Sequence, residues 1–326
     1  MKISIDVGNG YVKAVSENGD MLHFPTVLKE KNEKSLFNSK ANYQIKINDQ
    51  EYYIGEIALA KKAIRIWKND RTMNDYTEKF VALCCALLAK DDVNDIDLIL
   101  GLPYSYYLEQ MDSREFTDIF QDKEFDTTYW GEHKRFTIKS VKVYPQGVGA
   151  YFLNLFGISG KLKKGAAEFL KSLMIDVGYR TLDVVAFDTI NGEFVLIQEN
   201  SFTLEDCGVI NVVNHIVNVL SAEVQLDSDE VERWLRNGNG TIQYDGGDFD
   251  VSAYENEAYE ELANRIFTAI NTKLQGDIKK YKNIFITGGG AEKLYAVLQK
   301  KYKNLMLQDD YVYCNAKGYL AIEQAS

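Results

Sequence analysis

The sequence predicts an α/β protein built from two similar halves. Apolar strands alternate with amphipathic helices along the chain. The segment DVGNGYVKAV at residues 6–15 is echoed by DVGYRTLDVV at residues 176–185. Each begins where an apolar strand ends and runs on into a second strand. This matched context, about half a chain apart, favours an internal duplication over a chance repeat.

Length and composition indicate two domains of ordinary size. The chain has 326 residues, of which 46% are hydrophobic and 26% are charged, so each half has material for a core. Prolines number only 3, and no Gly/Ser-rich tract interrupts the sequence. We therefore expect a compact hinge between the domains and not a long linker.

Charge and cysteine content exclude several classes of function. The net charge of −11 argues against direct binding of nucleic acid, because phosphate requires a basic surface. The 4 cysteines form no C-x-x-C pair and have no histidine at metal-ligand spacing. The longest apolar stretch, residues 80–89, is too short for a bilayer, and no signal peptide precedes the first strand. We expect a cytoplasmic protein without a membrane partner.

The first half is expected to start as a meander of strands. Strands are predicted over 2–7, 11–16, 21–27, 95–103, 125–131 and 134–144, with a hairpin over 42–56 that turns at Asn48 and Asp49. Helices are predicted over 74–90, over 107–120 and from Pro145 onward.

The second half is expected to repeat this order and then become mostly helical. Strands are predicted over 172–178, 182–188, 193–201, 283–290 and near Met306. Helices are predicted over 205–222, 228–237 and 255–274, from Ala291, and from Asn315.

The two echoed turns are candidates for phosphate binding. Glycine-rich backbone after a strand presents N–H groups to phosphate oxygens, and glycine permits the tight turn. Asp6 and Asp176 end the preceding strands and would face each other across a cleft. Carboxylates repel phosphate, so their expected task is to hold Mg²⁺, mostly through its waters. One D-x-G turn is usually an ordinary β-turn, whereas two in matched settings favour the phosphate interpretation.

Three further segments are candidates for chemistry. Lys13 lies on the strand after the first turn, where its ammonium would neutralise phosphate charge; alone it would be taken for a solvent-facing lysine. The glycines 288–290 would let a base or ribose lie against the backbone, although a tight strand-to-helix turn is the simpler alternative. Gln146, placed in the first turn of the helix expected from Pro145, would orient a water for attack on a γ-phosphate.

Five segments thus stand in a fixed order, namely DVGNGYVK, VYPQGVGAYF, IDVGYRTLDVV, IFITGGGA and NAKGYLAI. This order resembles the actin-like ATPase superfamily, with its phosphate 1, connect 1, phosphate 2, adenosine and connect 2 motifs. The PQGVGA and NA-x-GY segments are most similar to ParM-type plasmid segregation proteins and archaeal actin-like proteins. The resemblance implies a duplicated actin/ribonuclease H-like fold whose two domains flank a nucleotide cleft. Domain I would cover 1–157, completed by a C-terminal helix at 313–326, and domain II would cover 171–312.

The resemblance also implies roles for individual residues. Catalysis would fall to Gln146, Asp176, Asp6 and Lys13, with Asp6 and Asp176 near the metal. The residues implied to contact the nucleotide are Gly8, Asn9, Gly10, Tyr11, Gly178, Tyr179, Arg180, Thr181, Gly208, Gly288, Gly289 and Gly290. Tyr179 and Arg180 depart from the small residues of many relatives, and Tyr11 departs from the small hydroxyl residue of actin. A γ-phosphate contact at Tyr11 is therefore expected from the backbone.

The expected function is that of an NTPase that binds ATP with Mg²⁺, polymerises into filaments and hydrolyses the γ-phosphate. GTP stays open as the nucleotide, because backbone glycines discriminate bases poorly. Resemblance alone implies plasmid DNA segregation through a DNA-binding adaptor protein on a plasmid centromere. One alternative is a small-molecule kinase of the same fold, which would need a base for its acceptor hydroxyl. Another is a scaffold that binds nucleotide only to lock a conformation. The sequence specifies neither filament polarity nor handedness.

Overall fold

The computed structural model describes residues 1–32, 43–63, 75–90, 94–113, 115–169, 171–221, 226–237, 240–244 and 246–325. The chain divides into two compact units. Unit 1 comprises residues 1–169 and 312–326, and unit 2 comprises residues 170–311. Residues 42, 74, 222 and 326, at the ends of expected segments, lie outside the described residues.

Unit 1 contains a large mixed sheet. Its strands are β1 (Lys2–Val7), β2 (Tyr11–Ser16), β3 (Met21–Pro25), β4 (Leu28–Glu30), β5 (Tyr43–Ile47), β6 (Gln50–Ile54), β7 (Asp95–Leu102), β8 (Glu124–Tyr129) and β9 (Glu132–Pro145). In the described part of the chain they join in the order β3-β2-β1-β7-β9-β8-β5-β6-β4. The β1–β7 and β7–β9 pairs are parallel, so the ends of these three strands meet at one edge.

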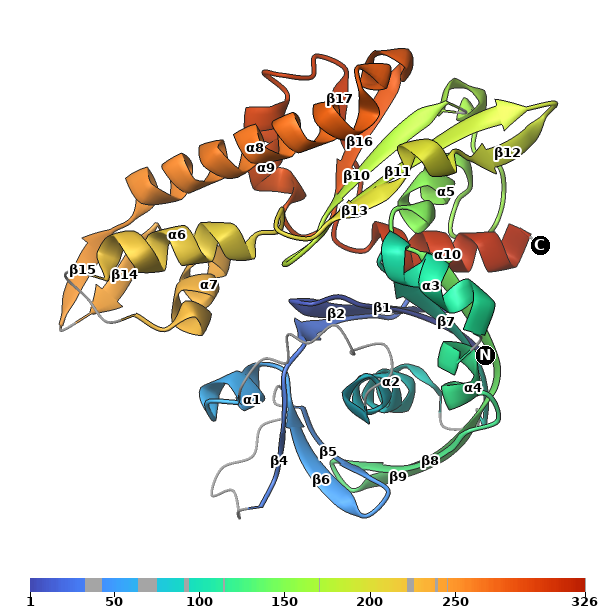
Figure 1. Ribbon diagram of the computed structural model, residues 1–326. Coiled ribbons are helices and arrows are strands. Elements are labelled where there is room, and N and C mark those ends of the chain that lie inside the picture. The colour runs from blue at the N-terminus through green and yellow to red at the C-terminus, as the bar shows by residue number, and fades with distance from the viewer. Residues whose placement is uncertain are drawn as a thin grey trace. The chain divides into compact units, whose positions relative to one another are not determined.

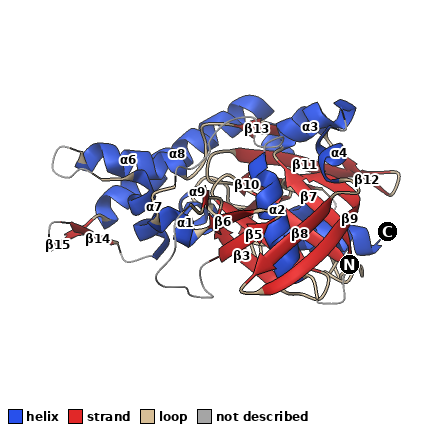
Figure 2. Ribbon diagram, turned by 90° about the horizontal axis from the view of Figure 1, so that it is seen from below, coloured by secondary structure: helices blue, strands red, loops and turns tan. Residues whose placement is uncertain are grey.

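The helices of unit 1 cover both faces of this sheet. They are α1 (Glu56–Ala60), α2 (Asp75–Leu88), α3 (Tyr104–Ser113), α4 (Glu115–Phe120), α5 (Val148–Leu155), the short 3₁₀ helix η2 (Ala166–Phe169) and α10 (Cys314–Ala325). The sheet curls around α2 (Figure 1), and the same strands are seen from below in Figure 2. Cys84 and Cys85 of α2 are fully buried in this core, as small apolar residues would be.

Helices α5 and α10 cross in direct backbone contact. A Cβ placed on Gly149 would lie 2.3 Å from the carbonyl oxygen of Asn315, and one on Gly318 would overlap the backbone of Gly149. Asn315 also caps α5, because its Oδ1 accepts hydrogen bonds from the backbone N–H groups of Gly147 (3.0 Å) and Ala150 (3.3 Å). The helix at the end of the sequence is thus an integral part of unit 1.

Unit 2 is a smaller sheet packed against helices. Its strands are β10 (Ser172–Val177), β11 (Leu182–Ile190), β12 (Glu193–Leu196), β13 (Phe202–Leu204), β16 (Asn283–Thr287) and β17 (Leu305–Leu307), with a separate hairpin of β14 (Thr241–Tyr244) and β15 (Gly247–Asp250). Its helices are η3 (Gln198–Asn200), α6 (Ile210–Leu220), α7 (Ser228–Asn237), α8 (Ser252–Leu274), η4 (Asp277–Lys280) and α9 (Ala291–Leu298). The sheet order is β12-β11-β10-β16-β17, and β13 also pairs with β11.

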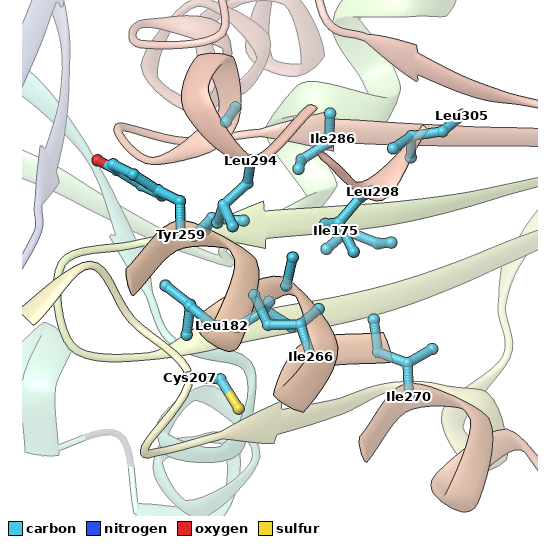
Figure 3. Packing of buried hydrophobic residues seen from close by; sticks show 14 of the residues in the cluster. Ile175, Leu182, Cys207, Tyr259, Ile266, Ile270, Ile286, Leu294, Leu298 and Leu305 are labelled. Carbon is cyan, nitrogen blue, oxygen red and sulfur yellow. The ribbon is translucent and has the colours of Figure 1, made fainter. Parts of the chain in front are cut away.

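One face of this sheet forms the core of unit 2. Alternate residues such as Ile175 of β10 and Leu182 of β11 point toward the helices and meet Ile266 of α8 and Leu294 of α9 (Figure 3). Helix α6 adds Val212, Val213 and Ile216 to the same cluster. The residues on this face are apolar at every second strand position, which explains why the strands were recognisable in the sequence.

Most predicted elements have the predicted type, but several boundaries differ. Asn48 adopts φ 52° in the turn between β5 and β6, as the hairpin signature requires. The helix expected over 107–120 starts at Tyr104 and is assigned as α3 and α4. The strand expected over 193–201 ends at Leu196, and the helix expected from 205 starts at Ile210. The β14–β15 hairpin was not expected.

The prediction of a helix from Pro145 is wrong. Pro145 is the last residue of β9, where it pairs with Leu102 of β7. The backbone N–H of Gln146 extends this pairing with a 2.7 Å bond to the carbonyl of Leu102. Gly147 then turns the chain with a left-handed φ of 85°, and α5 begins only at Val148. Gln146 is therefore held by the sheet and not by the helix.

No helix among the described residues is long and apolar enough to cross a membrane.

Replacing the cap that joins α5 to α10 should destabilise unit 1. Asn315→Ala removes the acceptor of two backbone N–H groups, so we expect the free energy of unfolding to fall by about 1–3 kcal/mol. Chemical denaturation measures the change. Gln324→Ala, an exposed position on the same helix, serves as the control and should leave the value almost unchanged. Equal effects of the two substitutions would contradict the capping role.

Candidate functional site

The first candidate turn connects β1 to β2. It is closed by a hydrogen bond of 3.1 Å from the N–H of Gly8 to the carbonyl of Tyr11. The carbonyls of Gly8 and Gly10 are both bound by Thr26, which follows β3: its hydroxyl donates to Gly8 (2.7 Å) and its N–H donates to Gly10 (2.9 Å). Gly8, Asn9, Gly10 and Tyr11 thus form one compact turn, with the end of β1 on one side.

Three of the predicted catalytic side chains converge beside this turn. Asp6 is opposite Lys13 in the β1–β2 register, and their carboxylate Oδ2 and ammonium Nζ are 3.4 Å apart. The side-chain Nε2 of Gln146 donates to the other oxygen of Asp6 at 2.8 Å. Lys13 also borders the turn, since its Nζ would be 3.2 Å from a Cβ built on Gly8. Asp6 therefore contacts both the ammonium of Lys13, 7 positions away in the sequence, and the amide of Gln146, 140 positions away.

The second candidate turn, in unit 2, has the same construction. The N–H of Gly178 donates to the carbonyl of Thr181 at 2.9 Å, as Gly8 does to Tyr11. Asp176 pairs with Asp183 in the β10–β11 register, at the positions equivalent to Asp6 and Lys13. Asp183 is buried and accepts a 2.5 Å hydrogen bond from the hydroxyl of Thr203. The repeated sequence thus forms the same turn hydrogen bond in both units, and Asp183 of unit 2 takes the position of Lys13 in unit 1.

Backbone groups hold the second turn from behind. The carbonyls of Gly178 and Tyr179 accept from the N–H groups of Val209 (3.2 Å) and Ile210 (2.8 Å), where α6 begins. Gly208 permits this close approach, because a Cβ there would lie 2.3 Å from the carbonyl carbon of Arg180. The first N–H groups of α6, which have no partner within the helix, therefore fix the turn.

The glycines that follow β16 have different surroundings. Gly288 has φ 89°, donates to the carbonyl of Tyr311 at 3.0 Å, and would place a Cβ 2.3 Å from Oδ1 of Asp176. Gly290 donates to the carbonyl of Val177 at 3.1 Å, and a Cβ there would lie 2.5 Å from the side chain of Val209. A Cβ on Gly289, in contrast, meets nothing within 4 Å. Two of these glycines are required by packing, and Gly289 faces open space.

The structure therefore collects the predicted site residues into two groups, one in each unit. The group in unit 1 contains Asp6, Gly8, Asn9, Gly10, Tyr11, Lys13 and Gln146. The group in unit 2 contains Asp176, Gly178, Tyr179, Arg180, Thr181, Gly208, Gly288, Gly289 and Gly290. Sequence reasoning missed Thr26, because a threonine beside a strand carries no distinguishing signal.

The donor set suits a nucleotide with a hydrated divalent cation. Within the described residues, no cluster of three or more His, Cys, Asp and Glu side chains is arranged to hold a metal ion. Asp6 and Asp176 are each the second-last residue of a strand that leads into a glycine turn, and their carboxylates offer the oxygen ligands that Mg²⁺ prefers. A cation at either turn would need phosphate and water as its other ligands. Each carboxylate is thus suited to a cation that brings phosphate oxygens with it.

Comparison with known proteins identifies the family. Residues 4–149 match the N-terminal domain of actin-like proteins, and residues 174–300 match the C-terminal domain of the MreB-like archaeal actin homologues. The chain belongs to the actin-like proteins. The matched segments contain all the site residues named above.

Individual relatives of this actin-like protein span its whole length. An archaeal actin homolog of Thermoplasma acidophilum is 24% identical over 330 residues, covering 97% of each chain. The ParM of a 15-stranded filament from Clostridium botulinum is 25% identical with a TM-score of 0.84, covering 100% of this chain and 99% of that one. An archaeal actin homolog in complex with ADP is 19% identical with a TM-score of 0.80 over the same shares. The predicted actin-like fold and the likeness to ParM-type and archaeal proteins are confirmed.

Alanine at Gly289 tests whether a ligand approaches the glycine loop. The methyl group meets open space in the protein, so the melting temperature should not change, whereas a base or ribose lying on this backbone would be displaced. We expect nucleotide affinity to fall by about tenfold or more, which corresponds to about 1.4 kcal/mol. Titration of a fluorescent nucleotide measures it. Unchanged affinity would mean that the ligand does not touch Gly289.

Gly288→Ala is the matched comparison for this substitution. Its Cβ would collide with Asp176 and with the backbone of Val177, at a residue that also needs a positive φ. We expect a lower melting temperature in this variant, in contrast to Gly289→Ala. Differential scanning calorimetry distinguishes the two, and an equally stable Gly288→Ala would contradict the packing described for the loop.

Proposed function

We propose that this actin-like protein binds ATP with Mg²⁺, assembles into filaments in that state and hydrolyses the γ-phosphate. The observation that carries the proposal is the hydrogen bond from Gln146 to Asp6. It brings an amide, held by the end of β9, to the carboxylate at the phosphate turn. An amide in that place has the chemistry to orient a water molecule for in-line attack.

Each residue of the group in unit 1 has a distinct task in this mechanism. The turn at Gly8 would receive phosphate oxygens, and Lys13 would offset charge that develops on the transferred phosphoryl group. When Nε2 of Gln146 donates to Asp6, its Oε1 is left to accept a hydrogen bond from the attacking water. The Gln146 role thus depends on Asp6 as its anchor. Positioning and electrostatics would supply most of the rate.

The group in unit 2 would contribute a second set of contacts to nucleotide binding. Its glycine turn at Gly178 would take further phosphate oxygens, and the open backbone at Gly289 would accept the ribose or base. Asp6 and Asp176 would hold Mg²⁺ through its waters. When bound, the metal ion would supply positive charge that neutralises phosphate oxygens. In this assignment unit 1 serves as domain I and unit 2 as domain II.

The relatives support two parts of the proposal, nucleotide binding and filament assembly. An archaeal actin homolog has been crystallised with ADP, which favours an adenine nucleotide over GTP. A ParM relative forms a 15-stranded filament, which favours self-association of this chain. Filaments of this kind in plasmid segregation would require a DNA-binding adaptor protein, because the chain itself has a net charge of −11.

Light scattering with parallel measurement of phosphate release tests the proposed function. With Mg²⁺ and ATP, scattering should rise above a critical protein concentration and decay as phosphate appears. Samples with ADP and without nucleotide are the controls. A sample with GTP in place of ATP shows which base the protein prefers. Phosphate release without scattering, over a range of salt and protein concentrations, would contradict filament assembly and would direct attention to a kinase that phosphorylates small molecules.

Two substitutions separate the tasks of the units. Gln146→Ala should slow phosphate release by about 10- to 100-fold and leave ATP-dependent scattering intact, because it removes the group that orients water. Asp176→Ala should weaken Mg²⁺-ATP binding or reduce turnover by at least about tenfold. Turnover assays and nucleotide titrations measure both. An Asp176→Ala variant with unchanged turnover would contradict the assignment of the second turn.

A further inference from the structure

We propose that Thr26 is a positioning residue that makes the first glycine turn able to receive phosphate. This inference rests on the proposed nucleotide binding but concerns a residue outside the motifs. Thr26 follows Pro25, which pairs with Tyr11 at the end of the β2–β3 ladder. This register places Thr26 directly behind the turn that joins β1 to β2.

Thr26 binds two carbonyl groups of the turn at once. Its hydroxyl Oγ1 donates to Gly8 at 2.7 Å, and its backbone N–H donates to Gly10 at 2.9 Å. The side chain is buried, with 4% relative exposure. Burial takes this hydroxyl away from water, so a hydroxyl left without a hydrogen-bond partner would cost free energy. The bond to the carbonyl of Gly8 avoids that cost.

Fixing these two carbonyls also fixes the polarity of the turn. In a trans peptide the C=O and the following N–H point in opposite directions. When the carbonyls of Gly8 and Gly10 point toward Thr26, the N–H groups of Asn9 and Tyr11 point away from it. The negative ends of both peptide dipoles are thereby kept away from the side on which an anion would bind. N–H groups with this orientation present their positive ends to an anion on that side of the turn.

The turn in unit 2 also has two anchored carbonyls, of which that of Gly178 corresponds to that of Gly8. There the carbonyls of Gly178 and Tyr179 are held by the backbone N–H groups of Val209 and Ile210. In both turns, two carbonyl groups thus accept hydrogen bonds from donors outside the turn. In unit 1 one of the two anchors is a side-chain hydroxyl, and a single substitution can remove it.

Substitutions at Thr26 isolate the effect of this hydroxyl. Thr26→Val keeps the shape but removes the donor, Thr26→Ala removes it with less bulk, and Thr26→Ser retains it. Thr127→Val is the matched control, because the Thr127 hydroxyl is also buried and donates to a backbone carbonyl, that of Lys134, at 3.0 Å within the β8–β9 pair. Thr127→Val should lower the melting temperature without changing the affinity for nucleotide.

The readout compares ATP, ADP and adenosine in competition titrations with Mg²⁺, alongside thermal unfolding of every variant. We expect Thr26→Val and Thr26→Ala to weaken ATP and ADP binding by about 5- to 100-fold, the equivalent of one lost buried hydrogen bond. Adenosine has no phosphate, so its affinity should change much less. Thr26→Ser should bind all three ligands as the unchanged protein does.

The outcomes distinguish this inference from the proposed function. If the unchanged protein binds no nucleotide, both are overturned. If it binds ATP and the hydroxyl-free variants bind equally well, Thr26 is not a positioning residue and nucleotide binding stands. An equal loss of affinity for ATP and adenosine, or a Thr26→Ser variant as weak as Thr26→Val, would also overturn the inference, because either result indicates general damage to the fold.

Discussion

The parallel pairing of β1, β7 and β9 is the constraint on which the group in unit 1 depends. These strands end together at one edge of the sheet, so Asp6 at the end of β1 and Gln146 just beyond β9 meet across β7. The antiparallel β1–β2 pair adds Lys13 opposite Asp6. Because side chains alternate along a strand, a shift of one residue in any of these registers would move a partner to the other face. The strand order thus fixes the positions of all three groups.

The two halves preserve this constraint while their side chains diverge. Both turns close with the same backbone hydrogen bond, and both place an aspartate opposite the seventh residue after it. In unit 1 that residue is a lysine that pairs with the aspartate. In unit 2 it is Asp183, whose carboxyl group accepts a hydrogen bond from the Thr203 hydroxyl. Backbone geometry is therefore the conserved element of the duplication, and charge is what distinguishes the halves.

The sequence was sufficient for the fold class and for locating the two glycine turns, since these depend on local patterns. Apolar alternation marked the strands, and glycine after a strand marked the turns. The remaining features depend on contacts distant in sequence. Nothing local shows that Pro145 completes a strand beside Leu102, or that Asn315 caps a helix that starts at Val148. The glycines after β16 also look alike in sequence, whereas the structure distinguishes Gly289 by the space around it.

The place of α10 has a consequence for the order in which the chain folds during synthesis. Unit 2 is one continuous segment, 170–311, and lies within the sequence of unit 1. Unit 1 needs α10, because Asn315 of α10 caps α5 and Gly318 of α10 packs against Gly149 of α5. A ribosome makes this helix after all of unit 2. Unit 2 can therefore reach its final packing before the last helix of unit 1 has been made. This reverses the usual order, in which the N-terminal domain folds first during synthesis.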